Sequence, residues 1–224
     1  MRQELAANKR VTPAQPPLSK YVYQGKTLSD WVRDLYSTNQ PVREAAHDAF
    51  TAMGADASPA IPSLAAILHT SRMPNAAVWA LAHIGPNALP TLINALTNGN
   101  TAARVEAAGV IGVLRDAAEE AVPAIVECLR HEDRFVRANA IAALQSIPKH
   151  TEVAVPALTV CLTDDEAMLR GNAATVLRSF GKAAESAIPE LVRAAREDKD
   201  FHVRTRATES LRMISPERAD AEGL

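Results

Sequence analysis

The chain has 224 residues and a formal net charge of −2, and 47% of its residues are hydrophobic while only 4% are aromatic. A charge so close to zero argues against a protein that follows a phosphate backbone, so we expect no nucleic-acid partner. No unbroken stretch of ~18 apolar residues, the length of a membrane-spanning helix, is present, and the N-terminus lacks the apolar segment of a signal peptide, so we expect a cytoplasmic protein without a membrane span.

The first part of the chain is expected to precede the folded array. Residues 1–20 are polar, mildly basic and contain three prolines, a composition that predicts a flexible lead. Tyr21 and Tyr23 come next, and we expect them to fold back over the open end of the first helix. Thr27 and Asp30 have the spacing of a capping box, which predicts that the first helix starts here.

Six helix pairs are predicted, because one helix–turn–helix pattern recurs along the chain. A small residue, an aliphatic residue and a proline open the first helix of five pairs, and these prolines are 28, 33, 33 and 33 residues apart. Proline suits the first turn of a helix, where its missing N–H would have no partner. We expect one repeat domain over 21–215 and a frayed tail over 216–224. The predicted pairs occupy about residues 28–53, 59–84, 88–114, 121–147, 154–180 and 187–214.

The second helices share several columns. Each carries an alanine three residues after its opening position, and apolar residues at seven and ten residues after that position lie on the same helical face. Gly54, Gly85 and Gly181 follow the last apolar residue and suit left-handed C-caps, whereas Arg115 takes this place in the third pair. An arginine opens the helix in five pairs, with Pro74 in its place in the second pair. We interpret the arginines as a structural ladder that bridges turns and neighbouring repeats: Arg43, Arg104, Arg137, Arg170 and Arg204.

This period and pattern resemble the HEAT-like repeat family, in the short form found in phycobilisome-lyase-type proteins. The motifs that carry the resemblance are the small–aliphatic–Pro start, the Asp-x-x-Val-Arg turn at Asp133–Arg137 and Asp200–Arg204, and the alanine-rich second helix that ends in Ile/Phe-Gly. The resemblance implies an all-α fold, a right-handed α-solenoid (α–α superhelix) of about six HEAT-like helix pairs over about 28–215.

The resemblance also implies that the second helices line a concave face. The middle of that face is small and uncharged, which is unusual for an exposed surface and favours a binding groove; an alanine-rich surface without a ligand is the alternative. Trp79 can anchor a peptide or an apolar ligand, and His83 lies one turn further on. In the alternative, the shortened second pair turns Trp79 into a gap between helices. The predicted binding residues are Asn75, Trp79, His83, Glu106, Gly109, Asn139, Ala142, Asn172, Thr175 and Arg206.

The two cysteines suggest neither a disulfide nor a metal site. Cys128 and Cys161 occupy one column in adjacent pairs, and packed helices lie about 8–10 Å apart, beyond the usual disulfide separation. We expect two reduced core cysteines, which is compatible with a reducing compartment. Cys128 and His131 have a C-x-x-H spacing, but structural zinc needs four ligands. We expect no metal and no other cofactor.

Three functional hypotheses follow. The leading one is a non-catalytic scaffold that binds another protein or a peptide on the concave face, present as a monomer or a weak homodimer. The second is an enzyme, because the family resembled here includes bilin lyases and alkylpurine DNA glycosylases; these need a tetrapyrrole-sized pocket and a basic, aromatic-lined face respectively. The third is an engineered repeat binder. No phosphate-binding loop or nucleophile elbow is present in the sequence.

Overall fold

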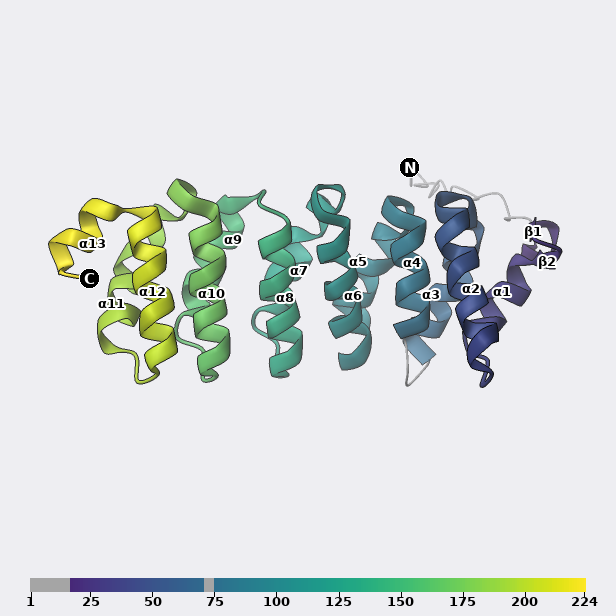
Figure 1. Ribbon diagram of the computed structural model, residues 1–224, viewed down its shortest axis with the longest axis horizontal. Coiled ribbons are helices and arrows are strands. Elements are labelled where there is room, and N and C mark those ends of the chain that lie inside the picture. Colours follow the sequence, from purple (N-terminus) through teal and green to yellow (C-terminus); the bar gives the residue numbers. More distant parts are fainter. Residues whose placement is uncertain (1–16, 71–74) are drawn as a thin grey trace, which may run out of the picture.

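The computed structural model describes residues 17–70 and 75–224, which form a row of stacked helix pairs (Figure 1). The even-numbered helices from α2 to α12 stand side by side in one layer, and the odd-numbered helices from α3 to α11 lie behind them. Each helix packs on its nearest neighbours, as α6 does on α4 and α8. The expected all-α solenoid is confirmed. The predictions for residues 1–16 and for Pro74 lie outside the described residues.

The six predicted pairs correspond to α1–α2, α3–α4, α5–α6, α7–α8, α9–α10 and α11–α12. Short 3-10 segments precede the first helix of four pairs. In chain order the elements are η1 Leu18–Lys20, β1 Val22–Tyr23, β2 Lys26–Thr27, α1 Leu28–Asp34, α2 Gln40–Met53, η2 Gly54–Ala60, α3 Ile61–Thr70, α4 Asn75–Ile84, η3 Gly85–Ala88, α5 Leu89–Asn98, α6 Thr101–Leu114, η4 Arg115–Ala121, α7 Val122–Cys128, α8 Arg134–Ser146, α9 Thr151–Cys161, α10 Ala167–Phe180, η5 Gly181–Ala187, α11 Ile188–Glu197, α12 Phe201–Ile214 and α13 Pro216–Glu222.

The core runs between the two layers along the whole array. The alanine column and the apolar column four residues later are completely buried, from Ala46 and Phe50 in α2 to Ala207 and Leu211 in α12. Alanine lets neighbouring helices approach closely, and each buried large side chain stabilises the fold by about 1.5–3 kcal/mol relative to an exposed one. Packing of this kind repeats at every junction, so the repeat register read from the sequence is also the register of the core.

The fifth pair starts differently from the others. Proline lies in the first turn of α3, α5, α7 and α11, but Pro156 lies inside α9, because α9 already begins at Thr151. No 3-10 segment precedes α9; instead His150 takes a left-handed conformation with φ 51° and ψ 40°. Pro148, which follows α8, therefore changes the entry to the next helix as well as ending the previous one.

The glycines after the second helices have positive φ, but two of them are not left-handed helical caps. Gly54 has φ 53° and ψ −127°, and Gly181 has φ 55° and ψ −130°. The predicted left-handed C-cap is therefore corrected at these two positions: the glycine turns the chain directly into a 3-10 segment. Arg115 adopts the same conformation, with φ 51° and ψ −131°. A side chain with a Cβ is strained there, whereas glycine is not.

The N-terminal end of the array is covered by a small hairpin. Val22 pairs with Thr27 between β1 and β2, and the indole N–H of Trp31 donates to the backbone oxygen of Tyr23 at 3.0 Å. Tyr21 and Tyr23 are half-buried and pack against the core. The two tyrosines thus cover the first helix, as expected.

The C-terminal segment is not a frayed tail. Pro216–Glu222 forms α13, which packs on α12 and buries Ala219 completely. The Glu222 carboxylate accepts from Arg196 at 2.7 Å and from Arg218 at 2.6 Å. Proline suits a helix start, so Pro216 begins a new short helix at the point where it ends the array, and that helix covers the last pair.

Candidate functional site

The ten predicted binding residues all reach the surface of the even-numbered helices. Five are exposed and five are half-buried. They do not form one site, because they are distributed from α4 to α12 along the length of the layer (Figure 1). The exposed ones are Asn75, Trp79, Gly109, Ala142 and Arg206, and the half-buried ones are His83, Glu106, Asn139, Asn172 and Thr175.

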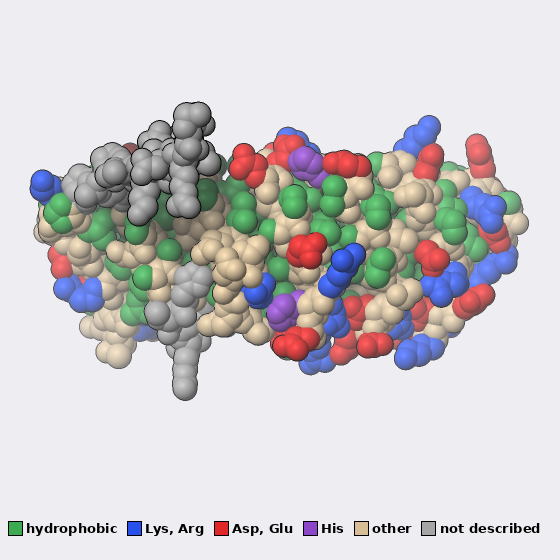
Figure 2. Space-filling view, turned by 180° about the vertical axis from the view of Figure 1, so that it is seen from behind, with side chains coloured by type: hydrophobic (Ala, Val, Ile, Leu, Met, Phe, Trp, Pro, Cys, Tyr) green, Lys and Arg blue, Asp and Glu red, His purple; other side chains and the backbone are tan. Residues whose placement is uncertain are grey.

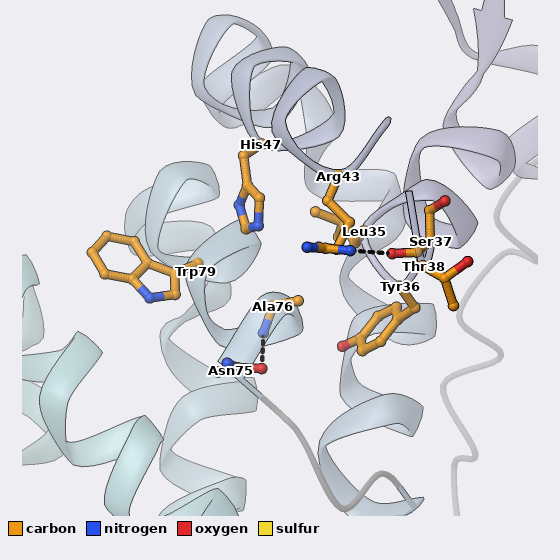
Figure 3. Close-up of a pocket in the computed structure, with 9 residues that line it drawn as sticks. All are labelled: Leu35, Tyr36, Ser37, Thr38, Arg43, His47, Asn75, Ala76 and Trp79. Atoms are coloured by element: carbon orange, nitrogen blue, oxygen red, sulfur yellow. Dashed lines mark hydrogen bonds between the residues drawn. The ribbon is translucent and has the colours of Figure 1, made fainter. Parts of the chain in front are cut away.

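A hollow of about 690 Å³ lies where α2, α4 and the turn after α1 meet. Asn75 and Trp79 are the only predicted binding residues that line it. Figure 3 shows the side chains of Arg43, His47 and Trp79 around one open space, with Tyr36 below. We call this hollow the Trp79 pocket; it is lined by Leu35, Tyr36, Ser37, Thr38, Arg43, His47, Asn75, Ala76 and Trp79.

Trp79 is exposed and is also held in place. Its side chain and backbone are 54% exposed together, so the alternative in which the shortened pair buries it is wrong. The His83 ring lies 6.1 Å away, centroid to centroid, at an interplanar angle of 33°. His83 Nδ1 lies 2.8 Å from the Trp79 carbonyl, and because a carbonyl only accepts, Nδ1 carries the proton. His83 therefore lies beside the indole and is bonded to the backbone of the same helix.

Several polar members of the pocket, among them Arg43 and His47, were not among the predicted binding residues. Arg43 was assigned to the structural ladder, and its Nη1 does donate to the Ser37 carbonyl at 2.7 Å. His47 lies one turn further along α2 and is half-buried. The spacing of four residues between them was a usable signal, since residues at i and i+4 share a helical face. The turn residues Ser37 and Thr38 offered no such signal.

A second, smaller hollow of about 310 Å³ lies between α6 and α8, and contains Gly109, Asn139 and Ala142. Its small residues have a packing role. A Cβ on Gly112 would lie 3.3 Å from the Cα of Ala143, so this glycine lets the two helices approach. A Cβ on Gly109 would have more room, since its nearest neighbour is Asn139 Oδ1 at 3.8 Å.

Arg206, the one basic residue among the predicted binding residues, is already engaged. Its Nη1 donates to Asn172 Oδ1 at 2.7 Å, and its aliphatic part covers Gly171, where a Cβ would lie 3.1 Å from Arg206 Cδ. Arg206 and Asn172 therefore form an internal pair across α10 and α12. Glu106 on α6 and Thr175 on α10 line neither the Trp79 pocket nor the hollow between α6 and α8.

Among the described residues, two members of the arginine column, Arg137 and Arg170, bridge to the next pair. Arg137 donates to both carboxylate oxygens of Asp164, at 2.8 and 3.0 Å, and Arg170 donates to both oxygens of Asp198 at 2.7 Å. The hydrogen bonds to these carboxylates raise the pKa of both guanidinium groups. Arg104 instead donates to backbone carbonyls of its own turn. Bridging to the next repeat therefore requires an aspartate at the start of the following turn.

Both cysteines are free and buried. Burial raises the pKa of the Cys128 thiol, and burial, with the nearby Asp164 charge, raises the pKa of Cys161 to about 11. Among the described residues, no three His, Cys, Asp or Glu side chains are grouped so that they could hold a metal ion.

One run of the described chain has the length and composition of a membrane-crossing helix. It spans Asn75–Asn98, with a mean hydropathy of 1.2, and half of it is buried inside the fold. It consists of α4 and α5 joined by η3, and these two helices belong to different layers (Figure 1). Its apolar character is thus explained by core packing.

On the opposite face, formed by the odd-numbered helices, the described residues form no large patch of only positive or only negative charge (Figure 2). Figure 2 shows basic and acidic side chains next to one another along its lower edge, with apolar side chains in separate spots between polar ones. A phosphate backbone attracts a continuous basic surface, and the visible part of this face offers none.

Stacked helix pairs with a Pro-opened first helix and an Arg-opened second helix define a short-repeat α-solenoid. The profile of HEAT repeats matches residues 89–178 and 155–222, and the profile of the PBS lyase HEAT-like repeat matches residues 75–98. The chain belongs to the HEAT-repeat family.

Solved structures with a similar fold include both designed and natural proteins. An engineered protein from the Northeast Structural Genomics Consortium is 22% identical, with a TM-score of 0.54, over 84% of this chain and 96% of that one. The complex of CpcE and CpcF of phycocyanin lyase from Nostoc sp. PCC7120 is 21% identical, with a TM-score of 0.57, over 68% of this chain and 98% of that one. A second engineered protein from the same consortium is 23% identical, with a TM-score of 0.52, over 87% and 60% of the two chains. No curated protein matches the sequence.

Proposed function

We propose that this protein is a non-catalytic scaffold that binds a peptide or a partner domain on the face of its even-numbered helices, with Trp79 as the anchor. The observation that carries the proposal is an indole that is 54% exposed at the edge of a hollow of about 690 Å³. Exposed tryptophans next to concave surfaces are typical of binding sites, because they bury a large area when a partner docks.

The enzyme alternatives rest on fold alone. The phycocyanin lyase subunits share the solenoid at 21% identity, and a shared fold does not transfer an activity. The Trp79 pocket opens on a stable, repeat-built surface, and stacked repeats are suited to binding extended partners. In keeping with its two buried free thiols, we further propose that the protein works in a reducing compartment such as the cytoplasm, as a monomer or a weak homodimer.

The test is a selection of displayed random peptides on the full chain, followed by affinity measurements with the Trp79→Ala variant. We expect the selected peptides to lose about tenfold or more in affinity, while the melting temperature changes little because Trp79 is more than half exposed. Phe135→Ala is a matched control, since Phe135 on α8 is 55% exposed. Binding that survives Trp79→Ala but is lost in Phe135→Ala would place the site elsewhere on the layer.

A further inference from the structure

The guanidinium of Arg43 faces the Trp79 pocket without the carboxylate that two of its counterparts, Arg137 and Arg170, have. Arg137 and Arg170 each donate two hydrogen bonds to an aspartate of the following pair. Arg43 donates to the Ser37 carbonyl at 2.7 Å, and no carboxylate of a described residue lies within 4 Å of it. One ladder position is thus open at the edge of the pocket.

The following pair cannot close that position, because it contains no acid. Between Asp56 and Glu106 the sequence has neither aspartate nor glutamate, so the whole α3–α4 pair lacks a carboxylate. The nine lining residues that Figure 3 labels include no aspartate or glutamate either. The pocket therefore combines a cationic fork with an aromatic side chain and lacks any negative side chain of its own.

The other ladder positions show which acceptor such an arginine binds. Arg170 Nε lies 2.7 Å from Asp198 Oδ2, and Arg170 Nη2 lies 2.7 Å from Asp198 Oδ1. This is the two-pronged geometry that an arginine makes with carboxylates. Asp198 Oδ1 also accepts from the N–H of Asp200 at 2.9 Å. The acceptor at this position is therefore an acidic side chain of a polypeptide, and a backbone N–H two residues further on also holds its carboxylate.

We propose that the Trp79 pocket binds an aspartate or glutamate side chain of a partner peptide on Arg43, with an apolar neighbour of that acid lying against Trp79. The inference rests on the proposed function and specifies its partner. The bound acid gives Arg43 the same kind of contact that Asp164 and Asp198 give Arg137 and Arg170, so the partner supplies from outside what the neighbouring pair supplies there. His47 lies on the same pocket wall and adds a second polar contact for the acid.

The experiment uses the peptides selected on the full chain, measured by fluorescence polarisation. Arg43→Gln should weaken binding by about tenfold or more, and replacing the peptide's acid by its amide should do the same. The two changes together should cost no more than either alone, because both remove one contact. Arg204→Gln is the matched control, since Arg204 belongs to the same column and also donates to one carbonyl, that of Asp198, at 2.7 Å.

Each outcome decides between the inference and the proposed function. Trp79-dependent peptides that contain no acid, or that bind Arg43→Gln as tightly as the parent protein, overturn the inference and leave the scaffold proposal standing. A loss on amidation of the peptide's C-terminus, with no loss on removal of its acidic side chain, overturns the side-chain assignment. If no selected peptide depends on Trp79, both fail. The peptide variants alone test the inference should Arg43→Gln unfold the protein.

Discussion

Arg170 and Asp198 form a two-pronged ion pair that joins the fifth helix pair to the sixth, with both side chains only 7% exposed. Arg170 also donates to the carbonyls of Asp164 and Asp165 in its own turn. The guanidinium therefore connects three segments: the start of α10, the turn before α10 and the turn of the next helix pair. A buried charge that has lost its partner is costly, which makes this junction sensitive to substitution.

Asp198→Asn is expected to lower the free energy of unfolding by about 3 kcal/mol, because it leaves the Arg170 charge buried without a counter-charge. Urea denaturation followed by circular dichroism measures this loss. Asp165→Asn is the control, since the Asp165 side chain is exposed and only its backbone carbonyl meets Arg170. Equal stability of the two variants would show that the ion pair contributes nothing to the junction.

Acid should weaken the same junction. Hydrogen bonds from Arg170 lower the pKa of the Asp198 carboxyl below its usual value of 3.8. Because the folded-state pKa lies below the unfolded one, the unfolded chain binds more protons, and the stabilisation is lost as the pH falls through the folded-state pKa. Unfolding free energies measured from about pH 5 down to about pH 2 should fall more steeply for the parent protein than for Asp198→Asn. Parallel curves would contradict this assignment.

His131 occupies, in the fourth pair, the place of Asp198 in the sixth. Its Nδ1 accepts from the N–H of Asp133 at 3.0 Å, just as Asp198 Oδ1 accepts from Asp200 at 2.9 Å. The turn is therefore already built for an acceptor side chain. What it lacks is the negative charge that would reach back to Arg104 of the third pair.

His131→Asp is expected to extend the ladder by one junction and to raise the free energy of unfolding by about 1 kcal/mol. His131→Asn is the matched control, because it keeps a turn acceptor without the charge. Thermal and urea denaturation of the two variants should separate them at low salt, and added salt should narrow the difference. If the aspartate and asparagine variants are equally stable, Arg104 does not reach the new carboxylate.

Arg115→Gly is expected to stabilise the protein. The strained conformation at φ 51° and ψ −131° is one that glycine adopts at the equivalent Gly54 and Gly181, and its relief is worth about 1 kcal/mol. The Arg115 side chain is exposed, so little is lost with it. Arg115→Ala removes the same side chain but keeps a Cβ; a melting temperature as high in that variant as in Arg115→Gly would rule out strain as the cause.

The two thiols should be unreactive in the folded protein. A pKa of about 11 for Cys161 and a raised pKa for Cys128 leave little thiolate at pH 8, so a disulfide reagent should react about a hundredfold more slowly than with an exposed cysteine. The Ser179→Cys variant, at an exposed position of α10, supplies that reference. Both native thiols should react fully in urea. Rapid reaction without urea would mean that the core opens locally.

Spacing alone was enough to predict the repeat register. The buried alanine column from Ala46 to Ala207 and the leucine-type column beside it recur at a helical period, and every junction buries the same two columns. Such a pattern survives insertions in turns, because a turn can change length without rotating a helix. The α13 helix escaped prediction because it occurs once, and its contact between Arg196 and Glu222 is not part of the repeat.

The Trp79 pocket could be predicted only in part. Asn75 and Trp79 were found because their column predicts exposure on a second helix. Arg43 and His47 were not included, because their neighbours across the junction decide whether they are neutralised or left open. Whether such a side chain is paired depends on which residue of the next turn contacts it. The repeat period alone does not reveal that contact between two segments.

Because Arg137 and Arg170 each bind the turn of the next pair, the linkage depends on the junction between two pairs and not on a fixed position in the chain. Excising residues 131–163 would join Arg130 directly to Asp164, and Arg104 would then meet the carboxylate that His131 does not supply. Whole units can thus be gained or lost by duplication and deletion without any new contact having to arise. The length of the solenoid can therefore change by one helix pair at a time, while the end that contains Trp79 keeps its structure.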